Sequence, residues 1–358
     1  MKKRIFMDYK DKIEQMLIND EVGMLSDLKF YQSYSSDKPE DYHFVKSDNV
    51  FTRKARLLQA IRRWQSGAEC GSFIKGGIRY YHPNLAEDGE RSGCNFLHHE
   101  IFEYAKYRIK NKKKYETIES NRLFNNFLSS QPMAFNLFYP LMEIVKCDEG
   151  KCRLANVISR LVDKCNILNI EKITEVGIEF IPDYYECCLN DKTAMDAFLR
   201  YVTYDGRKGI IAIETKYTDT LGKNQASDSS WAINAAQCDG ISQIFTKEGR
   251  EYIASGRIKL SQVYRNFLLT ESVRLYEKLD ESISIVVSPQ ENKSNKKDEE
   301  QLSDILDNKY KYKFQVFSLE TFVDAIISEF SDEEIFKRFR HRYLDFRTAE
   351  WLLEHALK

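Results

Sequence analysis

The stretch TAMDAFLRYVTYDGRKGIIAIETKYTD, residues 193–219, decides the fold of this 358-residue chain. It predicts a β-hairpin with strands over 194–204 and 209–218, joined by a turn at Asp205-Gly206. The second strand reads GIIAIETKY: it is apolar on both faces up to Ile213 and then becomes abruptly charged. Burying an unpaired charge is costly, so we expect the charged end of this strand to serve a function.

Strand geometry predicts which charged side chains share a face. Side chains alternate along a strand, so Glu214 and Lys216 point the same way, with Cα atoms about 6.6 Å apart. A three-residue loop at 205–207 would place Asp196 opposite Lys216, and a five-residue loop would also keep all three on one face. A two-residue loop would instead place Asp196 on the face of Thr215. The hairpin register is therefore a test of the predicted site.

Two carboxylates and a lysine on one face suit the hydrolysis of phosphodiester bonds. Carboxylate oxygens bind Mg²⁺, which prefers one or two carboxylates together with waters and phosphate oxygens. Such a metal polarises the scissile phosphate and makes water easier to deprotonate. The lysine can orient the nucleophile or neutralise charge in the transition state. We therefore expect Asp196 and Glu214 to be metal ligands and Lys216 to be catalytic.

This arrangement resembles the PD-(D/E)xK nuclease superfamily, whose fold is restriction-endonuclease-like. The matching residues are Asp196 and the triplet Glu214-Thr215-Lys216, separated by the 17 residues 197–213. Met195 stands where the family name has Pro. The wider chain looks like a branch of uncharacterised bacterial restriction-endonuclease-like proteins. The stretches that carry this wider resemblance are FLSSQPMAFNLF (127–138), EVGIEF (175–180), DGRKGIIAIETKYTD (205–219) and QVYRNFLL (262–269).

The resemblance implies a metal-dependent nuclease that cleaves DNA with Mg²⁺, for which Mn²⁺ substitutes. It implies a role in restriction, anti-phage defence or repair, and a homodimer or a defence-system partner protein. The superfamily usually adds an acidic or amide residue from a neighbouring element. Glu179 and Gln131 are the preferred candidates for that role, ahead of Glu100 and Glu103.

The remaining elements predict an α/β protein: a central mixed sheet flanked by helices, with a largely helical N-terminal extension. We expect a mostly helical region with basic helices over 1–115, a nuclease core over 116–330 and a C-terminal helix over 331–358. The expected strands are 173–181, 194–204, 209–218, 283–288 and 313–317. The expected helices include 8–17, 53–64, 96–113, 122–138 ending before Pro140, 153–168, 231–244 and 260–279.

Basic side chains are candidates for holding the phosphates of a nucleic acid. The chain has 54 Lys and Arg against 55 Asp and Glu, a net charge of −1, which excludes a histone-like polycation. A polyanionic substrate would therefore need a local basic patch. The candidates are Arg53, Arg56 and Arg63 on helix 53–64, Lys112, Lys113 and Lys114 at the end of helix 96–113, and Gln262 and Arg265 on helix 260–279.

Other classes of protein find little support. The apolar runs 209–213 and 283–287 are far shorter than the roughly 18–20 residues of a membrane-spanning helix, and charges interrupt the N-terminal stretch, so we expect no membrane association and a cytoplasmic location. No phosphate-binding glycine loop or serine-hydrolase elbow occurs. Two alternatives stay open: a catalytically inactive nucleic-acid-binding protein with a degenerate nuclease fold, and a helical interaction protein with an incidental Glu-x-Lys triplet. The second predicts no charged face on the sheet.

Overall fold

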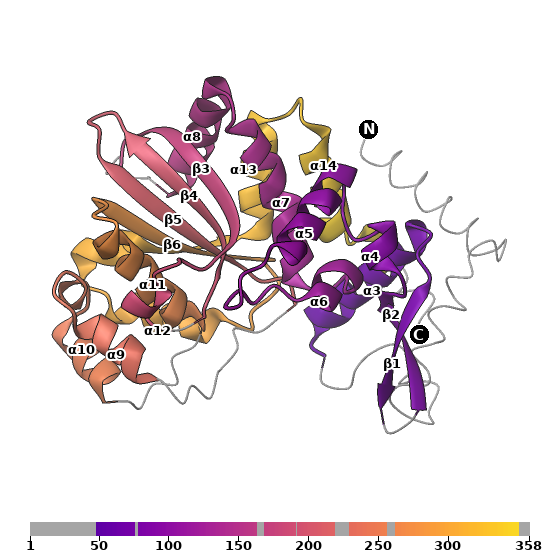
Figure 1. The fold of residues 1–358 in the computed structure, drawn as a ribbon, viewed down its shortest axis with the longest axis horizontal. Coiled ribbons are helices and arrows are strands. Elements are labelled where there is room, and N and C mark those ends of the chain that lie inside the picture. The colour runs from indigo at the N-terminus through magenta and orange to yellow at the C-terminus, as the bar shows by residue number, and fades with distance from the viewer. Residues whose placement is uncertain are drawn as a thin grey trace. The chain divides into compact units, whose positions relative to one another are not determined.

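The computed structural model describes residues 48–75, 78–162, 168–190, 192–218, 229–255 and 262–350 (Figure 1). The helix expected at 8–17 lies outside this part of the chain. The described residues form two compact units: 48–95, 120–128 and 341–350 make up one, and 96–119 and 129–340 the other. These units divide the chain elsewhere than at the expected boundaries, and the three-part division remains a prediction.

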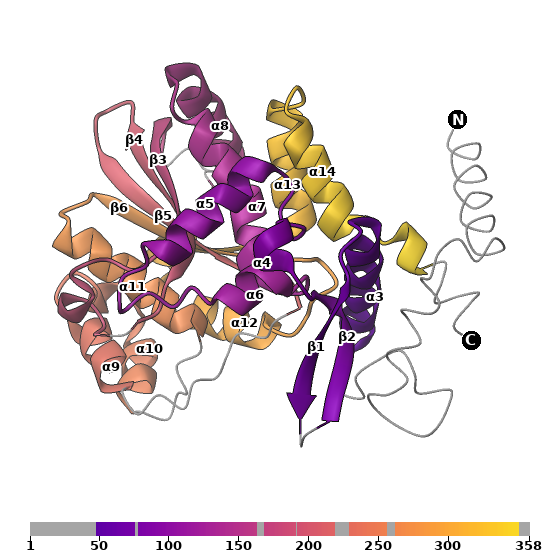
Figure 2. The ribbon, with the colours of Figure 1, turned by 45° about the vertical axis from the view of Figure 1, so that its right-hand side comes forward.

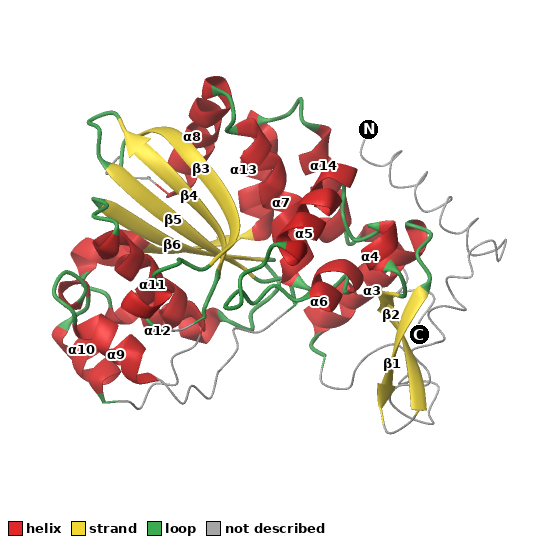
Figure 3. Ribbon diagram, in the orientation of Figure 1, coloured by secondary structure: helices red, strands yellow, loops and turns green. Residues whose placement is uncertain are grey.

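A five-stranded mixed sheet forms the centre of the larger unit (Figure 3). Its strand order is β3-β4-β5-β6-β7; the first two pairs are antiparallel and the last two are parallel. All five expected strands are present, which confirms the α/β class. The strands are β3 (Ile170–Phe180), β4 (Met195–Thr203), β5 (Lys208–Thr215), β6 (Glu281–Ser288) and β7 (Phe314–Ser318).

Helices cover both faces of this sheet (Figures 1 and 3). On one face α7, α8 and α13 pack against the strands, and on the other face α11 packs on β5 and β6. Strand β5 is buried from Gly209 to Thr215, which explains its apolar run. The helices of this unit are α5 (His99–Lys110), α7 (Ser130–Ile144), α8 (Asp148–Val162), α9 (Ser229–Gln237), α10 (Lys247–Ala254), α11 (Gln262–Tyr276), α12 (Lys296–Ile305) and α13 (Leu319–Glu329), with short 3₁₀ turns at Tyr185–Cys187, Ser242–Ile244 and Asn308–Lys313.

The smaller unit pairs a helix with a β-hairpin, and Figure 2 shows β1 and β2 beside α3. Arg63 of α3 is 1% exposed and donates hydrogen bonds to the carbonyls of Pro83 (2.7 Å) and Ala68, which tie the helix to strand β2 and to the residues just before strand β1. The elements are α3 (Val50–Gln65), β1 (Cys70–Lys75), β2 (Ile78–Ala86), α4 (Gly89–Ser92) and α6 (Ser120–Asn125); α14 (Glu334–Leu344) leads into the C-terminal part of this unit.

The helix expected over 122–138 is in fact two helices, α6 and α7. Ser129 caps α7 by accepting a hydrogen bond from the Gln131 amide (3.2 Å), and Pro132 lies in the first turn, where a missing N–H costs nothing. The expectation that the helix stops before Pro140 is wrong, because α7 continues through Pro140 to Ile144. In the described part of the chain, no helix combines the length and the apolar character needed to cross a membrane.

Candidate active site

The register of the β4–β5 hairpin places the three predicted residues on one face. Val202 pairs with Lys208 and Ala197 with Ile213, so residues 203–207 form a five-residue loop. The same register carried on by one residue sets Asp196 opposite Glu214, on the face that Lys216 also shares. The sequence left the loop length open, and the structure has the five-residue alternative, which keeps all three residues on one face with Asp196 opposite Glu214 rather than Lys216.

Thr215, the middle residue of the triplet, holds Asp196 in place. The Thr215 amide N–H donates to Asp196 Oδ2 (2.8 Å), and the Thr215 hydroxyl donates to the same oxygen (2.9 Å). On its other side β5 continues its pairing with β6, where the Lys216 amide donates to the Val287 carbonyl (2.9 Å). The end of β5 is therefore fixed from both neighbouring strands.

Glu214 lies at the centre of the charged cluster. Its side chain is 2% exposed, and Oε1 is 2.5 Å from the Lys216 ammonium nitrogen, which is itself buried. The Asn266 amide donates to Oε2. Burial, followed by the nearby Asp196 carboxylate, raises the pKa of Glu214 to about 8, and Lys216 opposes that rise. Without a bound cation, Glu214 is therefore protonated at neutral pH far more than an ordinary carboxyl group.

Glu179 and Gln131 join this cluster from β3 and α7. Gln131 Nε2 donates to Glu179 Oε1 (3.0 Å), and both side chains are buried. On β3 the two neighbours of Glu179, Ile178 and Phe180, pair with Ala197 and Met195, which brackets Asp196. The Glu179 carboxylate also contributes to the raised pKa of Glu214. The structure therefore brings together all five residues that the sequence singled out for the site.

Glu179 adopts a left-handed backbone conformation, with φ at +52°, that residues other than glycine rarely adopt. Arg108 of α5 donates hydrogen bonds to the carbonyls of Ile178 and of Glu179 (3.0 Å), and forms an ion pair with Glu116 (3.3 Å). Sequence reasoning did not single out Arg108 for this role. A residue that its surroundings hold in a left-handed backbone conformation is strained, and such strain is concentrated at functional sites.

This strain gives a prediction that separates backbone conformation from charge. Glu179→Gly and Glu179→Ala both remove the carboxylate, but glycine adopts a positive φ without penalty. We expect Glu179→Gly to be more stable than Glu179→Ala by about 1 kcal/mol. Chemical unfolding midpoints of the two variants measure the difference, and equal midpoints would show that the conformation carries no strain.

Asn266 is the second residue that sequence reasoning missed. It lies on α11 between Val263 and Thr270, on a helix side that is buried, and its Oδ1 has no hydrogen-bond partner. An asparagine at a buried helix position is costly without a partner, and this could have drawn attention to it. Gln262 and Arg265, the residues singled out on this helix, are half-buried, and their binding to nucleic acid stays a prediction.

The basic side chains that were candidates for holding phosphates differ in their burial and in their partners. Arg63 is buried and donates to backbone carbonyls, which argues against a phosphate contact, and Arg56 is largely buried in an ion pair with Asp48 (2.7 Å). Arg53 is exposed and donates to the Asp48 carbonyl (3.2 Å). Two of the three α3 arginines that were candidates for holding phosphates, Arg56 and Arg63, therefore make contacts within the smaller unit. Lys112, Lys113 and Lys114 follow α5 and are exposed; Lys112 donates to the Ile118 carbonyl (2.8 Å) and Lys113 pairs with Asp183.

The donor set fits a small hard cation. Asp196 and Glu214 offer carboxylate oxygens at a buried position. A divalent ion bound between them would offset the repulsion between the two carboxylates, which contributes to the raised pKa of Glu214. Within the described residues, no three His, Cys, Asp or Glu side chains are grouped so as to hold a metal ion. The two carboxylates of Asp196 and Glu214, together with water and phosphate oxygens, are a ligand set that Mg²⁺ accepts.

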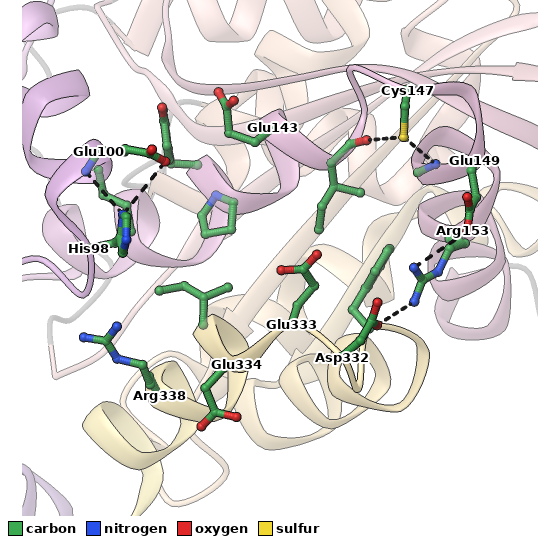
Figure 4. Close-up of a pocket in the computed structure, with 17 residues that line it drawn as sticks. His98, Glu100, Glu143, Cys147, Glu149, Arg153, Asp332, Glu333, Glu334 and Arg338 are labelled. Atoms are coloured by element: carbon green, nitrogen blue, oxygen red, sulfur yellow. Dashed lines mark hydrogen bonds and ion pairs between the residues drawn. The ribbon is translucent and has the colours of Figure 1, made fainter.

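A pocket of about 850 Å³ lies elsewhere in the same unit, at the far end of α7 (Figure 4). Pro140, which lines it, is nine residues from Gln131, or roughly 14 Å along a helix. Arg153 and Arg338 are outnumbered there by carboxylates, so the pocket would repel a polyanion. It is therefore not part of the candidate site. The carboxylates are Glu100, Glu143, Glu149, Asp332, Glu333 and Glu334.

Comparison with known proteins agrees with this geometry. No curated protein and no solved structure matched the chain. The family model described as the PD-(D/E)XK nuclease superfamily matches residues 46–345, which include both carboxylates, the lysine and the whole mixed sheet. The chain belongs to the PD-(D/E)XK nuclease superfamily.

Proposed function

We propose that this protein is a metal-dependent nuclease that hydrolyses the phosphodiester bonds of DNA. The observation that carries the proposal is the convergence of Asp196, Glu214 and Lys216 on one face at the end of β5. Glu179 and Gln131 complete the cluster through their hydrogen bond. Membership of a nuclease superfamily supports the reaction class and a nucleic-acid substrate.

Each residue has a proposed role. Asp196 and Glu214 would hold the divalent ion, Mg²⁺ with Mn²⁺ as a substitute. When bound, the ion would polarise the scissile phosphate and lower the pKa of water. Thr215 keeps Asp196 oriented, and Asn266 keeps Glu214 oriented, so neither carboxylate has to reorganise.

Lys216 would stabilise charge on the reacting phosphate. Its ammonium group is buried beside Glu214, where water screens charges weakly and an interaction with a phosphate oxygen is correspondingly strong. Gln131 and Glu179 would shape the wall of the site opposite Asp196. In the described structure Gln131 is itself fixed, because its Oε1 accepts a hydrogen bond from the Glu119 amide (3.3 Å).

The two other readings account for less of the structure. A helical interaction protein predicts no charged face on the sheet, whereas β3, β4 and β5 each contribute a charged side chain to one cluster. An inactive nucleic-acid-binding protein has no need for a lysine buried against a carboxylate, and the set Asp196, Glu214 and Lys216 is intact. We therefore favour an active enzyme.

Cleavage assays test the proposal. We expect the purified protein to cut plasmid or oligonucleotide DNA with Mg²⁺ or Mn²⁺, to stop cutting with EDTA, and to resume when excess Mg²⁺ is restored. Asp196→Asn, purified in parallel, is the control for a contaminating nuclease, because it removes a proposed metal ligand with little change in shape. Cutting that persists in EDTA, or its absence with either ion on both DNA and RNA, would contradict the proposal.

The biological setting follows from the resemblance. We propose a cytoplasmic protein acting in restriction, anti-phage defence or repair, as a homodimer or with a defence-system partner. Two-strand cutting requires either two active sites or two successive nicks, so product analysis on supercoiled plasmid connects the assay to the assembly. A single active site gives nicked circles before linear DNA appears.

A further inference from the structure

Two segments beside the candidate site are joined by an aromatic and charged cluster. The end of α5 and its following loop carry Lys113 and Tyr115, and the connection after β3 carries Asp183 and Tyr185. Lys113 and the Tyr115 hydroxyl both donate to Asp183 Oδ1. The rings of Tyr115 and Tyr185 are 5.1 Å apart and tilted by 40°. The Lys113 ammonium lies 5.7 Å from the centre of the Tyr115 ring. These contacts hold the two rings in one place.

This cluster is continuous with the candidate site. Asp183 is four residues from Glu179, so their Cα atoms are separated by at most about 14 Å. Arg108 ties α5 to the carbonyl of Glu179, and the loop after Tyr115 reaches Gln131 through the Glu119 amide. The two rings therefore lie within a few nucleotides' reach of the carboxylates.

The character of the cluster matches single-stranded nucleic acid. Lys112, Lys113 and Lys114 are exposed, and Tyr115 and Tyr185 are half-buried, so each ring keeps surface in contact with solvent. Proteins that bind single strands combine positive groups, which follow the backbone, with aromatic rings on which bases stack. A base inside a duplex is already stacked on both sides and cannot use such rings.

Tyr184, the neighbour of Tyr185, has a structural role, so it is not a candidate for stacking on bases. Tyr184 stacks on Tyr276 at 3.9 Å and 13°, and its hydroxyl donates to Glu277, an acceptor shared with Arg200. That stack holds the β3–β4 connection against α11. The tyrosines beside the lysines that remain as candidates for stacking on bases are Tyr115 and Tyr185.

We propose that Tyr115 and Tyr185 form a stacking platform for unpaired bases of the substrate, while the adjacent lysines hold its phosphates. The substrate class is then DNA with a single-stranded stretch beside the scissile bond: a free single strand, an overhang or a flap. This inference rests on the proposed nuclease function and specifies the substrate of the same site.

Binding measured without cleavage tests the platform. Fluorescein-labelled single-stranded DNA and a blunt duplex of equal length are titrated with protein in EDTA, and anisotropy gives each affinity. The wild type binds the single strand more tightly than the blunt duplex. Tyr115→Ala and Tyr185→Ala each lose roughly ten- to a hundredfold in single-strand affinity. Tyr115→Phe and Tyr185→Phe keep the ring and stay within about threefold of the wild type.

Tyr204 provides the matched control. It is 70% exposed and lies in the loop of the β4–β5 hairpin, at the opposite end of those strands from Asp196. Tyr204→Ala leaves single-strand affinity unchanged. Alanine variants at Tyr115 and Tyr185 that bind like Tyr204→Ala would overturn the platform, as would a wild type that binds the blunt duplex at least as tightly as the single strand.

Cleavage of the same two DNAs with Mg²⁺ separates this inference from the proposed function. If blunt duplex is cut as fast as single-stranded DNA, the platform is wrong and the nuclease assignment stands. If neither DNA is cut with Mg²⁺ or Mn²⁺, the assignment as a DNA-cleaving enzyme fails, and the anisotropy result still decides whether the tyrosines bind single strands.

Discussion

Lys216→Ala is expected to slow DNA cleavage by roughly 10²–10³-fold, the loss seen when one charge-stabilising donor is removed from an active site. The expectation rests on where the ammonium group lies: it is buried, 2.5 Å from Glu214, at the end of a strand fixed on both sides. An interaction made mainly in the transition state lowers kcat and kcat/KM together when it is lost. Single-turnover cleavage at saturating DNA measures the change.

Lys216 also affects the pKa of the Glu214 carboxyl group beside it. The cleavage rates of the wild type and Lys216→Ala must therefore be compared at more than one pH. Lys216 lowers the pKa of Glu214, which burial and Asp196 otherwise raise. Without the lysine that pKa rises further, and more Glu214 is protonated at neutral pH. Rates are therefore compared at saturating metal and at two pH values, while Mn²⁺ binding by calorimetry reports the ligands directly. A rate deficit that persists when Mn²⁺ binding is equal belongs to the lysine.

The opposite pattern would identify a structural ion pair. In that case Lys216→Ala would cut DNA at the wild-type rate, while Glu214→Ala would unfold the protein. The inactive binding protein would then become the better account of the chain, despite its superfamily.

The hairpin could be predicted because its signals are local, whereas the length of its loop, and with it the register, stayed open among alternatives. Strand alternation and the switch from apolar to charged after Ile213 depend on neighbouring residues alone. Contacts within the loop stabilise the alternative that the structure adopts. The Thr203 hydroxyl donates to Asp205, Arg207 donates to the same carboxylate (2.9 Å), and the Thr203 amide donates to the Arg207 carbonyl (3.0 Å). In the resulting register Asp196, Glu214 and Lys216 share one face of the sheet.

The supporting residues depend on tertiary packing, which local patterns do not encode. Gln131 reaches Glu179 because a serine cap starts α7 beside the end of β3. The positive φ of Glu179 is held by Arg108, seventy-one residues away in sequence. Arg63 was a candidate for holding a phosphate at the surface, yet it is buried. Hydrogen bonds to two backbone carbonyls offset the cost of burying its guanidinium group.

A second large effect is expected from a buried charge network behind the site. Lys313 is 5% exposed and lies 3.3 Å from Glu271 and 3.2 Å from Glu281. Glu271, 1% exposed, also pairs with Arg274 (2.7 Å) and accepts a hydrogen bond from Ser282 (2.7 Å). The network ties α11, the helix that carries Asn266, to strand β6, so its loss would loosen the support of the candidate site.

Lys313→Met should lower the free energy of unfolding by about 3–5 kcal/mol, because it leaves a buried carboxylate without one of its cations. The same substitution at Lys337, in an exposed ion pair with Glu334 (3.4 Å), should cost less than about 1 kcal/mol. Urea unfolding midpoints followed by circular dichroism compare the two variants. Adding Glu271→Gln to Lys313→Met should recover part of the loss, since it removes the buried negative charge that Lys313 compensated, and the double-mutant cycle measures the coupling of the two residues. If Lys313→Met costs no more than Lys337→Met, the buried pair gives the sheet no more support than a surface pair does, and α11 is held in place by its apolar contacts.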